Sequence, residues 1–440
     1  MVPHNLRIAW KSLRRNPTLS MLIVSGIALG IALSTTFATV RHSFAKDPIP
    51  QKSGVLYNVR LDSWDPARPH PNPAAIPPQI TYRDARELLK STIPVRQSAM
   101  YKSQMYVFPD PKVGRPSQEL VRLCFADFFT MFAVPFRYGG PWGKDTDQKA
   151  EQVVVLSEEM NEKLFGGRDS VGKTVRIEDK DFRVVGVLDH WMPSIKFYDL
   201  TQNFVGAPEP LFIPFNLAEP LTVRTSGNTD GWGPSPSTPG PQGFLQSESV
   251  WLQYWVELPD GKARAAYHDY LLSYIATQKK MGRFPRPPRA EVSSVGELMT
   301  DQKVVPDAVN ALVVVALLFL AVCALNLVGL LLGKFLARAP EVGVRRALGA
   351  TRLDIFLQHV VECELIGVVG GLIGMGLSLL SLSALNTWLM LQTNRADFFQ
   401  LDLTMVLTAI GLSLAAGFIA GVYPAWRTCH IPPAIHLKVQ

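Results

Sequence analysis

Residues 308–333 read AVNALVVVALLFLAVCALNLVGLLLG and contain no Asp, Glu, Lys or Arg. A helix that crosses a bilayer needs about 20 consecutive, mostly apolar residues, and this run is long enough. Uncharged runs of the same kind cover residues 18–40, 365–394 and 403–426. Because buried helices of soluble proteins rarely stay uncharged over such lengths, the sequence predicts four transmembrane helices.

The composition of the whole chain agrees with a membrane protein. Charged residues make up 18% of the sequence, against about 25% in an average globular domain. The mean hydropathy is positive, at +0.11. A net charge of +7 would also suit a protein that binds nucleic acid, but the basic residues lie beside the apolar runs. We therefore expect a membrane protein with no nucleic-acid partner.

Basic residues mark one side of the membrane. They gather before the first run, between the second and third, and after the fourth: Arg7, Lys11, Arg14, Arg15, Lys334, Arg338, Arg345, Arg346, Arg352, Arg427 and Lys438. The connection between the third and fourth runs has one basic residue, Arg395. The positive-inside rule places both termini in the cytoplasm and residues 41–307 outside, which in a Gram-negative cell is the periplasm. We expect a multi-pass protein of the bacterial inner (plasma) membrane.

The first 17 residues predict a cytoplasmic amphipathic helix at the membrane surface. Leu6 and Trp10 fall on one helical face and Arg7 on another, so one face suits lipid and the other suits anionic headgroups. The apolar run that follows is longer than the core of a signal peptide, and no small-x-small cleavage site follows it. We therefore expect residues 18–40 to remain as an anchor.

Residues 41–307 predict a large mixed α+β domain between the first and second membrane helices. The patterns predict strands at 55–61, 99–108 and 250–258, a hairpin over 174–188, and helices at 81–90, 157–165 and 263–280. A further helix is expected to run from Val295 straight into the second membrane helix, with a kink at Pro306. Two proline-rich stretches, 66–78 and 206–243, interrupt the domain, and we expect the second to be a mobile loop.

Residues 167–174 read GRDSVGKT and match the phosphate-binding pattern GxxxxGK[ST]. A working phosphate loop follows a strand and opens a helix, whose N-terminal amides hold the phosphates. Here the predicted helix precedes the motif and the predicted strand follows it, on the side of the membrane that lacks ATP. We therefore interpret the motif as a glycine turn that leads into a hairpin, with Lys173 in solvent.

No catalytic, cofactor-binding or metal-binding residues are predicted. Of the four cysteines only Cys124 lies in the outer domain, so no disulfide can form within it, and Cys124 is expected to be a small buried residue. The Cys and His residues lack metal-ligand spacing. Asp189 and His190 come nearest to a catalytic pair, but neighbours along a strand point to opposite faces. A periplasmic enzyme therefore finds no support.

The predicted cytoplasmic segments are short. They cover residues 1–17, 334–364 and 427–440, and none is long enough to form a nucleotide-binding domain with its own core. If ATP drives this protein, we expect ATP and Mg²⁺ to be bound by a separate cytoplasmic ATPase.

The segment 334–364 contains the residues that we expect to contact such a partner. Pro340 suits the first position of a short helix, Gly349 its C-terminal cap, and Thr351 with Asp354 the cap of the next helix. The candidate coupling residues are Glu341, Val342, Gly343, Arg345, Arg346, Leu348 and Gly349. Such a helix can dock on a soluble partner and pass on its movement. The alternative is an ordinary charged connector.

Glycines spaced four residues apart suit close packing of membrane helices. The candidate packing positions are Gly26, Gly30, Gly367, Gly370, Gly371, Gly374, Gly417 and Gly421. The four runs carry no central charge, so no ion relay or polar pore is predicted. This pattern favours transmission of movement by packed helices over a channel through the bilayer.

Three stretches resemble the FtsX/MacB family of ABC permeases. They are EVGVRRALGA at 341–350, GVYPAWR at 421–427, and the segment 164–187, which contains LFGG and FRVVGV. The order of one span, a large outer domain and three spans is similar as well, so the resemblance covers nearly the whole chain. Pro340 stands where a basic residue is expected, and 206–243 resembles an insertion.

The resemblance implies an exporter permease that works by mechanotransmission, in which a partner ATPase moves the spans and the outer domain moves substrate outward from the periplasm. It also implies a dimer with a second copy or a related permease, contact of residues 341–349 with the ATPase, and a smaller β-rich subdomain around 167–245. Membrane lipid is a further expected partner, and a periplasmic adaptor and an outer-membrane channel are optional ones. Lipoprotein release, regulation of wall hydrolases, and ligand sensing without transport are the alternatives.

Overall fold

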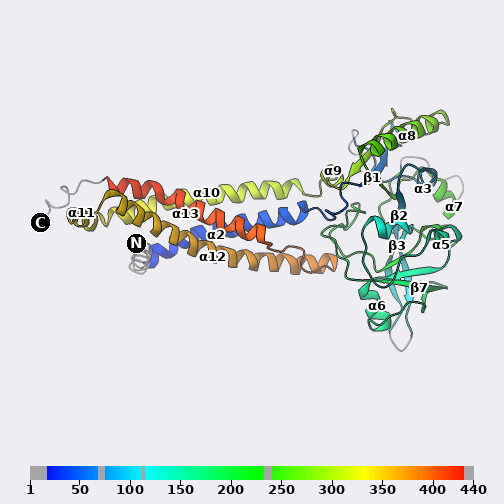
Figure 1. Cartoon of the computed structure of the whole chain (residues 1–440), viewed down its shortest axis with the longest axis horizontal. Helices are drawn as coiled ribbons and strands as arrows, with labels where there is room; N and C mark the ends of the chain where they lie inside the picture. The colour runs from blue at the N-terminus through cyan, green and yellow to red at the C-terminus, as the bar shows by residue number, and fades with distance from the viewer. Residues whose placement is uncertain (1–16, 68–74, 111–113, 232–239, 431–440) are drawn as a thin grey trace. The chain divides into compact units, whose positions relative to one another are not determined.

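The computed structural model describes residues 17–67, 75–110, 114–231 and 240–430. The chain divides into two compact units, which we call the helical unit (Met1–Lys46 with Val305–Gln440) and the sheet unit (Asp47–Val304), and each is described by itself. Figure 1 shows the chain coloured from its N-terminus to its C-terminus. The amphipathic helix expected over the first 17 residues, Pro17 excepted, and the tail from 431 lie outside the described residues.

The helical unit consists of long apolar helices and one short helix. They are α2 (Pro17–Ala45), α10 (Asp307–Leu336), α11 (Ala339–Ala347), α12 (Arg352–Thr393) and α13 (Leu403–Cys429). Among the described residues, the four long helices are each apolar enough to cross a membrane. Their ends extend beyond the uncharged runs, because backbone hydrogen bonding continues past the last apolar residue. Most of the expected connection 334–364 is therefore helical.

The long helices pack through small and β-branched side chains. Helix α2 lies against α10 and α12, and both of these also contact α13 (Figure 1). The interior contains Ile27, Ile31 and Leu327, each at most 2% exposed. Ser34 Oγ donates to the carbonyl of Ala316 at 3.1 Å, which satisfies a polar group inside the apolar interface. Large apolar side chains also cover the outside of these helices, as expected for surfaces that face lipid.

The sheet unit is built on a mixed sheet of ten strands. In sheet order nine of the strands are β10 (Ala290–Ser294), β1 (Leu56–Leu61), β9 (Gln253–Glu257), β2 (Arg96–Phe108), β3 (Ser117–Cys124), β8 (Leu211–Pro214), β5 (Val153–Leu156), β7 (Lys180–Leu188) and β4 (Phe136–Gly139). The tenth strand, β6 (Thr174–Ile177), lies outside this order and pairs with β2 and β7. Only the β3–β8 and β5–β7 pairs are parallel among these described strands. The long strand β2 joins the two halves, because its first residues pair with β9 and its later residues with β3 and β6.

Short helices surround this sheet. They are α3 (Tyr82–Leu88), α4 (Asp127–Met131), α5 (Lys144–Lys149), α6 (Glu158–Phe165), α7 (Pro241–Gln246), α8 (Gly261–Lys280) and α9 (Val295–Asp301), with a 3₁₀ turn η1 at Phe215–Leu217. The described sheet unit is therefore α+β, as the sequence predicted.

Local capping signals produced the helix ends that the sequence predicted. Thr81 accepts a hydrogen bond from the backbone of Asp84 at the start of α3, and Ser157 accepts one from Met160 at the start of α6. Helix α6 ends at Gly166, whose φ of +63° lies in the left-handed region that favours glycine. The hairpin of β6 and β7 over 174–188 is confirmed.

The expectation of one continuous helix from Val295 into the second membrane helix is wrong. Helix α9 ends at Asp301, and α10 begins at Asp307. Lys303 has a φ of +50°, which breaks the helical path, and Pro306 is the N-cap of α10 rather than a kink within a helix. A proline is well suited to this place because a helix start needs no donor from its backbone nitrogen.

The expected boundaries within the outer domain also need correction. Strands β3, β4 and β5 lie before residue 167 in the chain but share one half of the sheet with β6, β7 and β8, so that half does not begin at 167. The stretch 206–243 is not a loop throughout, because β8 lies inside it with buried residues. Ser103 Oγ also donates to the carbonyl of Arg224 at 2.6 Å, which holds the chain after β8 against β2.

Candidate functional site

The short helix α11 lies between the two long helices α10 and α12. Pro340 stands in its first turn, one residue later than predicted, with the acidic Glu341 next to it. The chain leaves the helix through Gly349, whose φ of +104° excludes most other residues. Thr351 and Asp354 form the predicted capping box of α12, in which the backbone nitrogen of Asp354 donates to Thr351 Oγ1 at 3.1 Å. The sequence alone therefore located both ends of this element.

The structure does not place all of the candidate coupling residues on one surface. Leu348 is 83% exposed, and Glu341 and Gly349 are exposed as well. Val342, Arg345 and Arg346 are half-buried, and Gly343 is buried. Although Gly343 is buried, a Cβ added there would meet no atom of another element within 4 Å among the described residues.

The two arginines of α11 hold the helix to its neighbours. Arg345 donates to Gln358 of α12 at 3.0 Å and to Glu341 at 2.7 Å. Arg346 donates to the backbone carbonyl of Cys429, at the end of α13, at 3.4 Å. These side chains therefore join α11 to α12 and to the end of α13.

Apolar side chains remain exposed at this end of the helical unit. Val344 is 49% exposed and Leu348 is 83% exposed, and they lie four residues apart on one face of α11. Leu353 in the first turn of α12 is 63% exposed. We call these three residues the α11 ridge. The charged side chains of Glu341 and Arg345 flank it, and such a small apolar ridge with a charged border suits a groove of another protein.

Behind α11 lies a buried ion pair that the sequence analysis missed. Lys334 Nζ of α10 lies 2.7 Å from Glu362 Oε1 of α12, and both side chains are at most 2% exposed. Arg338 Nη1 lies 3.7 Å from the same carboxylate oxygen. Next to this pair, the ring of His359 lies on Phe335 with centroids 4.0 Å apart. The sequence carried a signal for this pair, because Lys334 follows the apolar run 308–333 and the oppositely charged Glu362 precedes the run 365–394.

Most of the candidate packing glycines lie where two helices come close. A Cβ added at Gly30 would lie 2.7 Å from a carbon of Leu320, and one at Gly374 would lie 2.7 Å from the backbone oxygen of Ala28. Similar contacts closer than 3.4 Å surround the other candidates on α12 and α13, namely Gly367, Gly370, Gly371, Gly417 and Gly421. Gly26 differs, because no atom of the described residues lies within 4 Å of such a Cβ.

The phosphate-loop motif has the wrong surroundings for nucleotide binding. Residues 167–173 follow helix α6 and lead into strand β6, the reverse of the arrangement that holds phosphate. Lys173 is exposed, and its Nζ lies 5.0 Å from the centroid of the Phe165 ring. The interpretation as a turn into a hairpin is confirmed.

Within the described ranges, no group of three or more His, Cys, Asp or Glu side chains is arranged to hold a metal ion. His190 is exposed and lies 3.7 Å from Glu158, while its backbone nitrogen donates to Asp189. Cys124 is buried, as predicted.

The four long apolar helices and the separate mixed sheet define a multi-pass membrane protein with a large domain outside the bilayer. The family described as MacB-like periplasmic core domain matches residues 20–273, and the one described as FtsX-like permease C-terminal matches residues 313–433. The chain belongs to the MacB/FtsX-type family of ABC transporter permeases. It is an inner-membrane protein, and the sheet unit is its periplasmic domain.

The chain is also similar to individual proteins. The chain is 25% identical to the Pyoverdine export ATP-binding/permease protein PvdT of Pseudomonas syringae pv. tomato, over 99% of this chain and 59% of that protein. It is 23% identical to the Macrolide export ATP-binding/permease protein MacB of Shigella sonnei, over 97% of this chain and 59% of that protein. The chain therefore spans about 59% of the length of these curated relatives. The crystal structure of the periplasmic region of MacB from Actinobacillus actinomycetemcomitans aligns with a TM-score of 0.36 at 13% identity, covering 58% of this chain and 97% of that one.

Proposed function

We propose that this chain is the permease subunit of an ABC-type exporter that receives ATP-driven movement at α11 and transmits it to the periplasmic domain. The observation that carries the proposal is the α11 ridge. Val344 is exposed on the short helix α11, Leu348 directly after its end, and Leu353 in the first turn of α12. Arg345 and Arg346 join α11 to Gln358 of α12 and to the carbonyl of Cys429 at the end of α13, so a partner that moves the α11 ridge also acts on these helices.

The charge distribution supports a cytoplasmic position for α11. Basic residues gather around this end of the helical unit, including Arg338, Arg346 and Arg352. The positive-inside rule then puts α11 and both termini in the cytoplasm, where ATP is available to a partner. The same reasoning puts the sheet unit, which follows α2 in the chain, on the other side.

We assign ATP and Mg²⁺ to a separate ATPase chain. The names of the relatives include both ATP binding and permease, and the family of export permeases implies an ABC ATPase partner. The two families that match here describe a periplasmic domain and a permease. The described residues contain no strand that leads into a phosphate loop and then a helix.

The proposal includes movement of substrate outward from the periplasm by the moving periplasmic domain. The four long helices carry no charge in the middle of their apolar runs, so transmission by helix packing fits them better than a polar path. A second copy or a related permease would complete the assembly, and an adaptor with an outer-membrane channel would extend it. These partners are part of the proposal.

An affinity-tagged full chain purified with its membrane partners tests the proposal. After irradiation with 8-azido-ATP, we expect label on a co-purifying chain and none on the permease. The label should be lost when Leu348 is replaced by Glu. Absence of any ATP-labelled partner would favour a ligand sensor instead, and label on the permease itself would show that this chain binds the nucleotide.

A further inference from the structure

The chain passes between its two units at two places. It leaves α2 at Ala45 and reaches β1 at Leu56, and it leaves α9 at Asp301 and enters α10 at Asp307. Any displacement of α2 or α10 is therefore delivered covalently to β1 or to α9. The contacts between β1 and α9 decide whether the periplasmic domain receives one movement or two separate ones.

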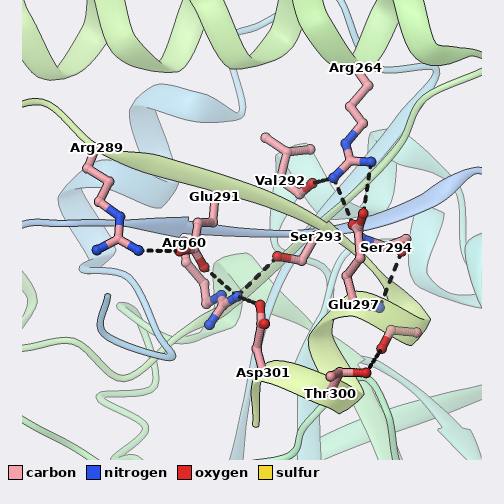
Figure 2. A network of polar contacts seen from close by, with 11 residues as sticks. Arg60, Arg264, Arg289, Glu291, Val292, Ser293, Ser294, Glu297, Thr300 and Asp301 are labelled. Carbon is pink, nitrogen blue, oxygen red and sulfur yellow. Dashed lines mark hydrogen bonds and ion pairs between the residues drawn. The ribbon is translucent and has the colours of Figure 1, made fainter. Parts of the chain in front are cut away.

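A buried arginine joins them. Arg60 of β1 has a side chain that is 4% exposed, and one of its terminal nitrogens, Nη2, lies 2.8 Å from Asp301 Oδ2, at the last residue of α9 (Figure 2). The same nitrogen lies 2.6 Å from Glu291 Oε2 and 3.0 Å from Ser293 Oγ, both on β10. One guanidinium thus links the strand that begins the domain, the edge strand β10 and the helix that ends the domain.

A second arginine fixes the other end of α9. Arg264 of α8 donates to Glu297 at 2.7 Å and to the backbone carbonyl of Val292 at 2.6 Å, as Figure 2 shows. Glu297 also completes a capping box with Ser294, so α9 starts directly from the end of β10. Both ends of this short helix are therefore tied to the sheet and to α8.

These contacts give α9 a fixed orientation that its apolar contacts alone do not specify. The helix buries Val295, Leu298 and Met299. Charge-assisted hydrogen bonds are directional, so the contact between Asp301 and Arg60 favours one orientation of α9 against β1. Rotation of α9 away from β1 would break this contact.

We infer that Arg60 is a positioning residue for transmission: it makes the two connections move as one body. We call Arg60, Glu291 and Asp301 the Arg60 clasp. Movement that enters through α10 is then passed to β1, β10 and α8 rather than absorbed by a turning α9. The inference rests on the proposed function, because it assumes that movement of the membrane helices is what the periplasmic domain responds to.

Hydrogen–deuterium exchange on the full complex tests this inference. The complex of the chain with its ATP-labelled partner is compared without nucleotide and after trapping with ATP and vanadate. In the unmodified complex we expect exchange to change both in peptides from α11 and in peptides from β1, β10 and α8. With Arg60→Met, we expect the change at α11 to remain and the change in the periplasmic peptides to fall about threefold or more.

Three further variants separate transmission from mere folding. Asp301→Asn removes one carboxylate charge from a half-exposed position, and it should reduce the periplasmic change even if Arg60→Met unfolds the domain. Arg60→Lys keeps the charge and should restore part of the response. Arg289→Ala is the control, because it removes a 47% exposed arginine from Glu291 and leaves Arg60 and Asp301 in place; it should behave as the unmodified chain.

The outcomes are distinct. If trapping changes exchange at neither α11 nor the periplasmic peptides in the unmodified complex, the proposed function fails and takes the inference with it. If α11 responds, and the periplasmic peptides respond equally in the unmodified chain and in the Arg60→Met and Asp301→Asn variants, the proposed function stands. The Arg60 clasp is then overturned as a transmitting element.

Discussion

Lys334 Nζ lies 2.7 Å from Glu362 Oε1, and both side chains are excluded from solvent. The two residues come from α10 and α12, the helices that α11 connects. The ion pair therefore joins the end of α10 to the first part of α12, the two helices that precede and follow α11 in the chain.

Breaking this ion pair on one side should destabilise the helical unit. Glu362→Gln leaves the buried Lys334 ammonium without its carboxylate, and we expect a loss of about 3–5 kcal/mol in the free energy of unfolding. Thermal unfolding of the purified chain in detergent measures the loss. Exchange of both charges, Lys334→Glu with Glu362→Lys, should recover part of it. Equal stability of the single and exchanged variants would show that the pair contributes packing and not charge.

Replacement of Leu348 by Glu should weaken the contact with the ATPase without affecting membrane insertion. The side chain is 83% exposed, so the substitution costs little in folding, but it places a charge in the middle of the α11 ridge. Met281→Glu is the matched control, since Met281 is a 62% exposed apolar residue of the periplasmic domain. The amount of ATP-labelled partner recovered with each variant is the measurement. Retention of the partner by the Leu348 variant at the control level would remove the ridge from the interface.

Alanine at Gly374 should loosen the contact between α12 and α2. The added Cβ would lie 2.7 Å from the carbonyl oxygen of Ala28, a backbone atom that cannot rotate away, so we expect a loss of about 1–3 kcal/mol. Gly376→Ala on the same helix is the control, because nothing among the described residues lies within 4 Å of its Cβ. Melting temperatures of the two variants decide the point. Similar melting temperatures for both variants would mean that α2 and α12 do not depend on the close approach at Gly374.

Alanine at Lys173 should leave ATP turnover by the complex unchanged. The lysine is exposed over the Phe165 ring in the periplasmic domain, and its loss costs about 0.5–1 kcal/mol at most. Phosphate release by the complex with and without the substitution is the test. A large drop in turnover would return nucleotide binding to the GRDSVGKT segment.

The stability of the periplasmic domain should depend on pH through Asp147. Burial raises the pKa of this carboxyl to about 6, although its oxygens accept hydrogen bonds from the backbone of Ala126 and from the Trp142 ring nitrogen. The folded state thus binds the proton more tightly than the unfolded state, whose pKa is near 3.8. Protonated Asp147 therefore contributes to the free energy of unfolding below about pH 4. This contribution, about 3 kcal/mol, is lost as the pH rises to about 6.

Asp147→Asn provides the comparison, since the amide does not titrate. The difference in unfolding free energy between the unmodified chain and this variant should shift in favour of the variant as pH rises from 4 to 7. Chemical denaturation followed by tryptophan fluorescence at both pH values measures the shift. A difference that stays constant with pH would show that Asp147 has an ordinary pKa.

Several sequence predictions held because the features are local. The capping residues Thr81, Ser157 and Thr351 act within four residues of themselves, so the helix starts could be predicted without knowledge of the fold. The continuous helix through Pro306 was predicted wrongly, because the backbone of Lys303 takes a left-handed conformation between α9 and α10, which the side-chain pattern of the sequence does not indicate. The strand β8 was missed since its few residues pair with strands distant in the sequence.

The sequence by itself determined the four membrane helices, since lipid accepts only long apolar helices whose backbone groups are satisfied internally, and this condition is visible in composition alone. It also determined the glycine turn at 167–174, because the order of helix and strand around it is local. Only the tertiary structure decided that Lys334 meets Glu362 and that Arg60 meets Asp301. Each pair joins residues of different elements, and the cost of burying Lys334, Glu362 and Arg60 is offset only when folding brings a partner of opposite charge to each of them.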